Sequence, residues 1–179
     1  MPGSPHMNLL FRLLRVVLAA RFRPRTGFLD ETSVFFRVWP TDLDALWHMN
    51  NGKYCSLMDL GRVDMMIRNG IARLIMAQGW YPVIAGEWIR FKSSLTPFTR
   101  FELRTRPIGW DDKSFYLRQT FLVKGRIVAV GLVRARFLAK AGGTVDAPAL
   151  VAQIAPEIQS PPLPDYVRDW QAAEEHLSA

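Results

Sequence analysis

The fold is decided by the stretch Thr41-Asp42-Leu43-Asp44-Ala45-Leu46-Trp47-His48-Met49-Asn50-Asn51-Gly52-Lys53-Tyr54. Residues 32–38, just before it, are rich in β-branched and aromatic side chains, which is typical of a strand. From Tyr54 to Asn69, apolar residues recur at helical spacing, and Asn50 or Asn51 is a natural N-cap for that helix. We therefore interpret the stretch as a loop between a strand and a helix, and as the candidate active site.

Such a loop directs side chains and unpaired backbone N–H groups toward one point, beside the positive end of the helix dipole. An oxyanion is stabilised at such a point, and a carboxylate held there, such as that of Asp44, can activate water or attack a carbonyl itself. A simpler interpretation is that Asp42 and Asp44 are turn residues that hydrogen-bond their own backbone. Their spacing alone favours this simpler interpretation.

The stretch resembles the signature of the 4-hydroxybenzoyl-CoA thioesterase-like hotdog family. That signature runs Asp-x-Asp, a small gap, His-(Val/Met)-Asn-Asn and then a tyrosine on the central helix, and the matching residues are Asp42, Asp44, His48, Asn50, Asn51 and Tyr54. The resemblance runs roughly from Thr32 to Phe137, and residues 101–117 are most similar to the thioesterase-superfamily-member-six subgroup. Trp47 departs from the pattern, because many members have glycine there, and its indole is expected to narrow or reshape the acyl pocket.

The resemblance implies an α+β hotdog fold over residues 30–140, in which an antiparallel β-sheet wraps around a long central helix. It implies hydrolysis of an acyl-CoA or acyl carrier protein thioester, without a metal or redox cofactor. The implied catalytic residues are Asp44 as general base or nucleophile, with His48, Asn50 and Asn51 in support. Asp42, Trp47 and Tyr54 are assigned to substrate binding. The resemblance also implies a homodimer or a dimer of dimers, with paired active sites at the interface.

The remaining pattern agrees with that fold. The central helix places apolar residues and one glycine on a single face: Tyr54, Leu57, Met58, Leu60, Gly61 and Met65. Residues 71–78 predict a short second helix. Four strands then follow with short separators, which predict an antiparallel meander: Tyr81–Lys92, Phe101–Gly109, Ser114–Val123 and Arg126–Ala139. The last strand is apolar on both faces, which indicates a central or interface position.

The composition fits one domain, since 49% of the 179 residues are apolar. The net charge of +7 suits nucleic acid, an anionic membrane or the phosphates of coenzyme A. Nucleic acid fits least, because no zinc-finger spacing or RNA-recognition signature is present. We expect four basic residues on the sheet to hold the coenzyme A phosphates, with solvated strand faces as the alternative: Arg90, Lys92, Arg104 and Lys113. Cys55 is the sole cysteine, is predicted to be a small core residue, and suits a reducing cytoplasm.

Both ends of the chain extend beyond the predicted domain. Residues 1–6 resemble an expression scar, and residues 7–25 predict a basic amphipathic helix whose arginines make it a poor membrane span. That helix is expected either to lie on an anionic membrane or to pack against its own domain or a partner subunit. Residues 141–179 form a C-terminal extension that ends in a polar helix, with His176 and its neighbouring acids in a solvated tail.

Two other functions stay open at this point. A hotdog enoyl-CoA hydratase also pairs an aspartate with a histidine, but in an Asp-x-Asn-Pro-x-His pattern, and the spacing from Asp44 to His48 is one residue too short. A non-enzymatic acyl-CoA or lipid-binding protein at a membrane is suggested by the basic N-terminal helix and by Trp47. No Gly-x-Ser-x-Gly elbow, metal-ligand spacing or phosphate-binding glycine loop is present.

Overall fold

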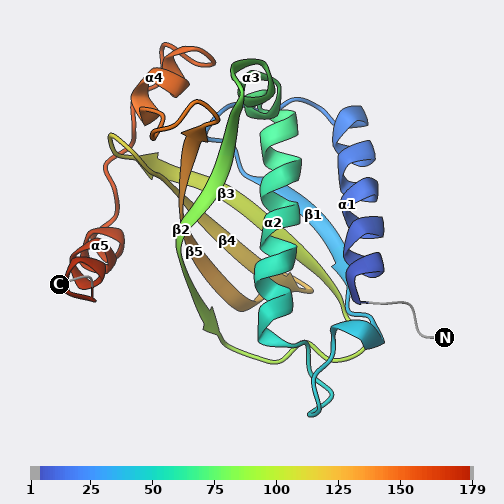
Figure 1. Cartoon of the computed structure of the whole chain (residues 1–179). Coiled ribbons are helices and arrows are strands. Elements are labelled where there is room, and N and C mark those ends of the chain that lie inside the picture. The colour runs from blue at the N-terminus through green and yellow to red at the C-terminus, as the bar shows by residue number, and fades with distance from the viewer. Residues whose placement is uncertain (1–4, 178–179) are drawn as a thin grey trace.

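A five-stranded antiparallel sheet curves around one long helix in the computed structural model, which describes residues 5–177 (Figure 1). The strands are β1 (Thr32–Arg37), β2 (Trp80–Phe91), β3 (Arg100–Trp110), β4 (Phe115–Val123) and β5 (Arg126–Ala139). Their order across the sheet is β1-β3-β4-β5-β2, so that β1 and β2 are the two edges. The predicted α+β hotdog fold is confirmed, and the predicted central position of the last strand is confirmed for β5.

The helices are α1 (Pro5–Phe22), the 3₁₀ turn η1 (Pro40–Asp42), α2 (Asn51–Arg68), α3 (Ile71–Gln78), α4 (Ala147–Ala152) and α5 (Asp165–Leu177). Helix α1 begins within the predicted expression scar, of which residues 1–4 lie outside the described part of the chain. Asn50 is the N-cap of α2, as predicted, because its side-chain oxygen accepts a hydrogen bond from the N–H of Gly52 at 2.9 Å.

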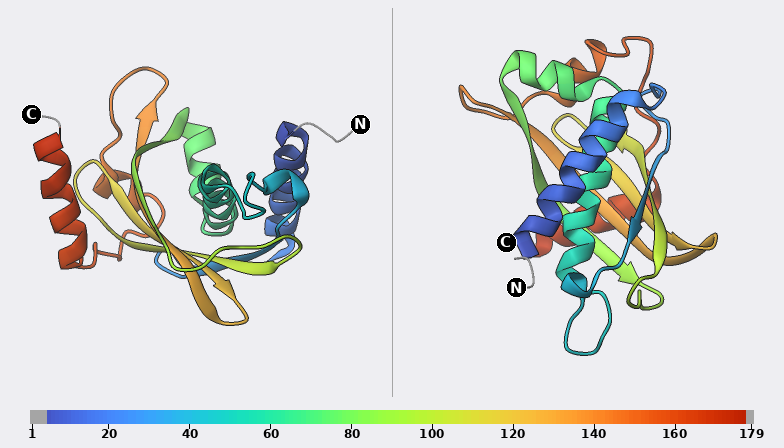
Figure 2. Two further views of the ribbon diagram at one scale, coloured as in Figure 1. Left: turned by 90° about the horizontal axis from the view of Figure 1, so that it is seen from below. Right: turned by 90° about the vertical axis from the view of Figure 1, so that its right-hand side faces the viewer.

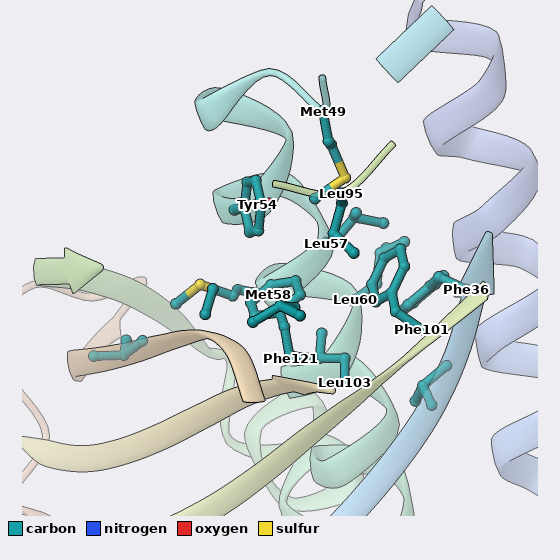
Figure 3. Close-up of a cluster of buried hydrophobic side chains, with 14 of the residues drawn as sticks. Phe36, Met49, Tyr54, Leu57, Met58, Leu60, Leu95, Phe101, Leu103 and Phe121 are labelled. Carbon is teal, nitrogen blue, oxygen red and sulfur yellow. The ribbon is translucent and has the colours of Figure 1, made fainter. Parts of the chain in front are cut away.

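The main core lies between α2 and the concave face of the sheet (Figure 3). Leu57 and Met58 are almost completely buried there, and each buried side chain of this size stabilises the fold by about 1.5–3 kcal/mol. Gly61 lets the helix approach the sheet, since a Cβ at this position would lie 2.7 Å from Oγ1 of Thr105. The predicted buried face of the central helix is confirmed.

Helix α1 packs along α2, on the same side of the sheet (Figure 2). Its inner face buries Val16, Ala20 and the guanidinium of Arg12. Of the alternatives predicted for residues 7–25, packing against the chain's own domain is therefore observed. The opposite face of α1 remains exposed and carries Leu10, Phe11, Leu14, Leu18 and Phe22. Within residues 5–177, no helix combines the length and the apolar character that a membrane span requires.

Two arginines of α1, and Arg23 just after its end, bind the edge of β1 that does not pair with β3. Three guanidinium groups donate to carbonyl oxygens of alternate residues of this strand, at 2.8–3.0 Å: Arg12 to Arg37, Arg15 to Phe35, and Arg23 to Ser33. Part of the positive charge that the sequence offered to a membrane or a polyanion is thus used inside the fold.

Helix α5 lies outside the curved sheet, on the face opposite α2 (Figure 2). Nε2 of Gln171 donates to the hydroxyl of Tyr116 at 2.5 Å. Glu174 forms an ion pair with Arg134 at 2.7 Å, so the prediction of a solvated tail is wrong for this acid. His176 is exposed, as expected. Helix α5 also buries Val167 completely, so its docking combines polar and apolar contacts, and the many charged residues of 165–177 concealed it in the sequence.

Candidate active site

Residues 43–49 form a tight loop that is closed by a bridge between Leu43 and Met49. Oδ1 of Asp44 accepts hydrogen bonds from the backbone N–H groups of Leu46 at 2.9 Å and His48 at 3.3 Å. The simpler interpretation, in which this acid stabilises its own turn, is therefore confirmed for one carboxylate oxygen. The side chain is nevertheless exposed, and no residue in the range 5–177 donates a hydrogen bond to Oδ2. That oxygen is available to a water molecule or a substrate.

Trp47 occupies the position in the loop that requires an unusual backbone conformation. Its φ of 60° lies in the left-handed region, which glycine adopts without strain and other residues adopt rarely. This explains why the family pattern has glycine here. The indole is 71% exposed and extends into solvent, so within one protomer it does not narrow an acyl pocket.

The residues after Trp47 lead directly into the positive end of α2. His48 is half-buried, and its imidazole makes no hydrogen bond with the described residues. Asn50 is used as the N-cap, whereas Asn51 is exposed as the first residue of the helix. The backbone N–H of Asn51 donates to no residue in the described range. An unpaired N–H group at a helix start is the type of donor that stabilises an oxyanion.

Asp42 and Tyr54 are not placed where a substrate could reach them. The Asp42 carboxylate is buried, and it accepts hydrogen bonds from Arg12 at 2.6 and 3.1 Å and from the N–H of Trp39 at 2.8 Å. Tyr54 lies in the core against Phe91, and burial is the main cause that raises the pKa of its hydroxyl. The structure therefore gives both residues a role in packing, in place of the predicted direct contact with substrate.

The four basic residues predicted to bind phosphate are not brought together in one protomer. Arg90 and Lys92 line a cleft beneath α5 on the outer face of the sheet. Arg104 is paired with Glu102 at 2.9 Å. Lys113 lies in the hairpin between β3 and β4, beside α4 and far from the loop that precedes α2 (Figure 1). Their assignment to coenzyme A stays a prediction, and Arg104 is the least available of the four.

An apolar cavity of about 300 Å³, which sequence reasoning missed, lies between α2 and β2. Its lining includes Met65, Met66 and Ile84, and Arg62 lies at its wall. Arg62 is buried, donates to Glu87 at 2.8 Å, and also pairs with Asp59. Because α2 begins at Asn51, the cavity lies toward the end of the helix that is farther from Asp44. The sequence contains no local signal for it, since its walls come from six separate helices and strands and from one loop residue.

The comparisons with known proteins agree with this geometry. The sequence profile of the thioesterase-like superfamily matches residues 38–171. The chain therefore belongs to the thioesterase-like superfamily, and its fold is the hotdog fold.

Individual relatives define the position within the family. Protein THEM6 from Xenopus laevis is 35% identical over 157 residues, which cover 87% of this chain and 74% of that protein. Protein THEM6 from Danio rerio is 40% identical over 126 residues, which cover 69% of this chain and 62% of that protein. The solved structure of BH1999 gentisyl-coenzyme A thioesterase shares the fold, with a TM-score of 0.61 and 23% identity over 67% of this chain and 98% of that chain. The predicted resemblance to the thioesterase-superfamily-member-six subgroup is confirmed.

Proposed function

We propose that the protein is an acyl-CoA thioesterase in which Asp44 is the catalytic carboxylate. The observation that carries the proposal is the loop itself, because Oδ1 of Asp44 is fixed by two backbone N–H groups while Oδ2 is free. Membership of the thioesterase-like superfamily supports thioester hydrolysis as the reaction. The N–H of Asn51, at the start of α2, is the donor we assign to the carbonyl oxygen of the thioester.

Two routes are consistent with this arrangement. As a general base, Asp44 takes a proton from water while the water oxygen attacks the thioester carbon, the C–S bond breaks, and the thiol leaves with a proton. As a nucleophile, the carboxylate oxygen attacks the same carbon and expels the thiol, which leaves a mixed anhydride that water then hydrolyses. Both routes yield a free acid and a thiol. The hydratase alternative is less well supported, since Asp44 binds the backbone N–H of His48 and not its imidazole.

We propose a homodimer formed through the β2 edge. Within residues 5–177 this strand has no neighbour on its outer side, and large apolar side chains along it are exposed: Tyr81, Ile84 and Phe91. A twofold axis at this edge would pair the two β2 strands and set the two α2 helices antiparallel. Asp44 of the partner subunit would then approach the far end of α2, where the apolar cavity lies. The cavity would hold the acyl chain, and each active site would need both subunits.

A panel of short, medium, long and aromatic acyl-CoA thioesters, with detection of the released thiol, tests the activity and finds the preferred acyl group. We expect Asp44→Asn to lower kcat by about a hundredfold or more, because the amide keeps the shape of the side chain but is neither base nor nucleophile. Asp112→Asn is the matched control, since it removes the charge of an exposed acid on the distant hairpin between β3 and β4. His48→Ala should cost less than Asp44→Asn. Retention of activity within about tenfold in Asp44→Asn would remove this residue from the mechanism.

A further inference from the structure

A second cleft, of about 630 Å³, lies between α5 and the outer face of the sheet. Its walls are mainly apolar and come from both sides: Trp88, Val130 and Leu132 from the sheet, and Tyr166, Trp170 and Ala173 from α5. This volume is within the range of small-molecule sites, about 300–1,000 Å³. The cleft is separated from the Asp44 loop and the inner cavity by the sheet itself.

Three cations line the same cleft: Arg90, Lys92 and Arg118. All three are exposed, and none of them forms an ion pair or a side-chain hydrogen bond with a residue in the range 5–177. By contrast, Arg134, on the same face of the sheet, is paired with Glu174 of α5. Among the described residues that line the cleft, Asp169 is the one acid, and it pairs with none of the three cations. The cleft therefore combines a hydrocarbon-like wall with an excess of positive charge.

The cleft depends on features that hold α5 at a fixed distance. A Cβ at Gly86 would lie 2.5 Å from Oε1 of Glu174 and 3.1 Å from the indole of Trp170, so a larger residue here would displace these two side chains of α5. At the other side, Gln171 binds the hydroxyl of Tyr116. Pairing of two β2 edges would use backbone groups and would leave the outer face of the strand uncovered.

We propose that this cleft binds a long-chain fatty acid, with the hydrocarbon chain between α5 and the sheet and the carboxylate among Arg90, Lys92 and Arg118. A single apolar chain matches the walls, and a carboxylate head group matches the unpaired cations. The nucleotide of coenzyme A satisfies the cations but not the walls, because it is polar over most of its surface. The fatty acid site is independent of thioester hydrolysis, since it lies on the other face of the sheet from Asp44.

The test is titration of the full chain with oleate below its critical micelle concentration. Calorimetry measures the heat of binding. Titration with a brominated stearate is followed by tryptophan fluorescence, because bromine quenches the indoles it touches and both Trp88 and Trp170 line the cleft. We expect saturable binding with one molecule per chain. Ala173→Trp, which fills the cleft, should weaken binding at least tenfold. Arg118→Gln should weaken binding of oleate by about three- to tenfold and leave binding of the uncharged methyl ester unchanged.

Arg73→Gln is the matched control, because it removes an exposed arginine of α3 that has no side-chain partner in the described chain. Thermal unfolding establishes that each variant is folded, and Asp44→Asn should bind oleate as the parent does. Two results would overturn the proposal. One is oleate binding that is unchanged in both Ala173→Trp and Arg118→Gln. The other is binding of free coenzyme A that these variants abolish while oleate does not compete, which would make the cleft a nucleotide site.

Discussion

The backbone of Trp47 stores strain in the loop that carries the candidate catalytic acid. Its φ of 60° is a conformation that costs a non-glycine residue of order 1–3 kcal/mol, and its exposed indole recovers little of this through burial in one protomer. The family pattern avoids the cost with glycine. Contacts within one protomer therefore do not compensate the backbone strain at Trp47.

We expect Trp47→Gly to leave the free energy of unfolding unchanged or to raise it by up to about 1 kcal/mol, because relief of strain is partly offset by the entropy of the unfolded glycine. Urea unfolding measures this. Trp39→Gly is the matched control, since Trp39 is also exposed but has an ordinary φ of −102° and should lose stability. A loss of more than about 1 kcal/mol in Trp47→Gly would mean that the indole is packed against a partner subunit.

Among single residues, those of the loop were predictable from the sequence, whereas the ion pair of Asp42 was not. The loop residues Asp44, His48 and Asn50 were predicted correctly in position, because the N-cap and the turn are set by neighbours in the chain. The role of Asp42 was not predictable in this way. Its partner Arg12 is 30 residues earlier, and a buried ion pair of this kind, whose disruption costs about 3–5 kcal/mol, leaves no local trace in the sequence.

At the scale of elements, α1 has two different faces. The inner face belongs to the core of the domain, so deletion of residues 1–25 would remove the partner of Asp42 and expose α2. The outer face exposes five large apolar side chains on one helix. This apolar patch is larger than expected for a helix face that contacts only water. We propose that this outer face touches an anionic membrane, with Arg21 and Arg25, which are both exposed, beside it.

Substitutions test this proposal better than deletion does. The double variant Leu14→Glu/Leu18→Glu changes only exposed positions of α1, so it should fold normally and lose most of its binding to vesicles that contain phosphatidylserine. Co-sedimentation with vesicles measures the bound fraction. A variant of the exposed α3 residue Met76, Met76→Glu, serves as the control for a charge added to an exposed apolar site. If the double variant and its parent sediment equally with vesicles, α1 is not a membrane contact.

The sequence predicted helices and strands where apolar residues recur at regular spacing. It did not predict where α5 docks. The strands and α2 follow from alternation and helical spacing, which are local properties of the chain. Helix α5 was expected from its sequence. Its contact with the sheet was not expected, because nothing in the sequence indicates that Gln171 and Glu174 bind residues of the sheet. The cavity and the cleft depend on several elements at once and had no signal.

At the scale of the whole molecule, the β2 edge is the predicted site of association. Ala85 is the position at which to test it, because the ladder between β2 and β5 skips from Ile84 to Gly86. Because proline is tolerated at bulges and in edge strands, Ala85→Pro should keep the fold and prevent a second strand from pairing with this edge. We expect the parent to sediment as a dimer and the variant as a monomer with much lower thioesterase activity.

Ala85→Lys is the second variant for this test, in case proline disturbs the strand, and circular dichroism verifies that both variants are folded. A variant that remains dimeric with an unchanged dissociation constant would place the interface elsewhere. A monomer with full activity would instead contradict the proposal that each active site needs both subunits.

The guanidinium groups bound at the β1 edge determine at how many edges the sheet can pair with another strand. A sheet with two open edges can add copies at both ends and grow into a filament. Here the carbonyl oxygens of Ser33, Phe35 and Arg37 already accept hydrogen bonds from arginines of α1 and from Arg23 just after it, and α5 lies over the outer face. In the proposed dimer, the two β2 strands would pair with each other and would leave no open strand for a third copy. The arginines at the β1 edge would therefore limit association to two copies.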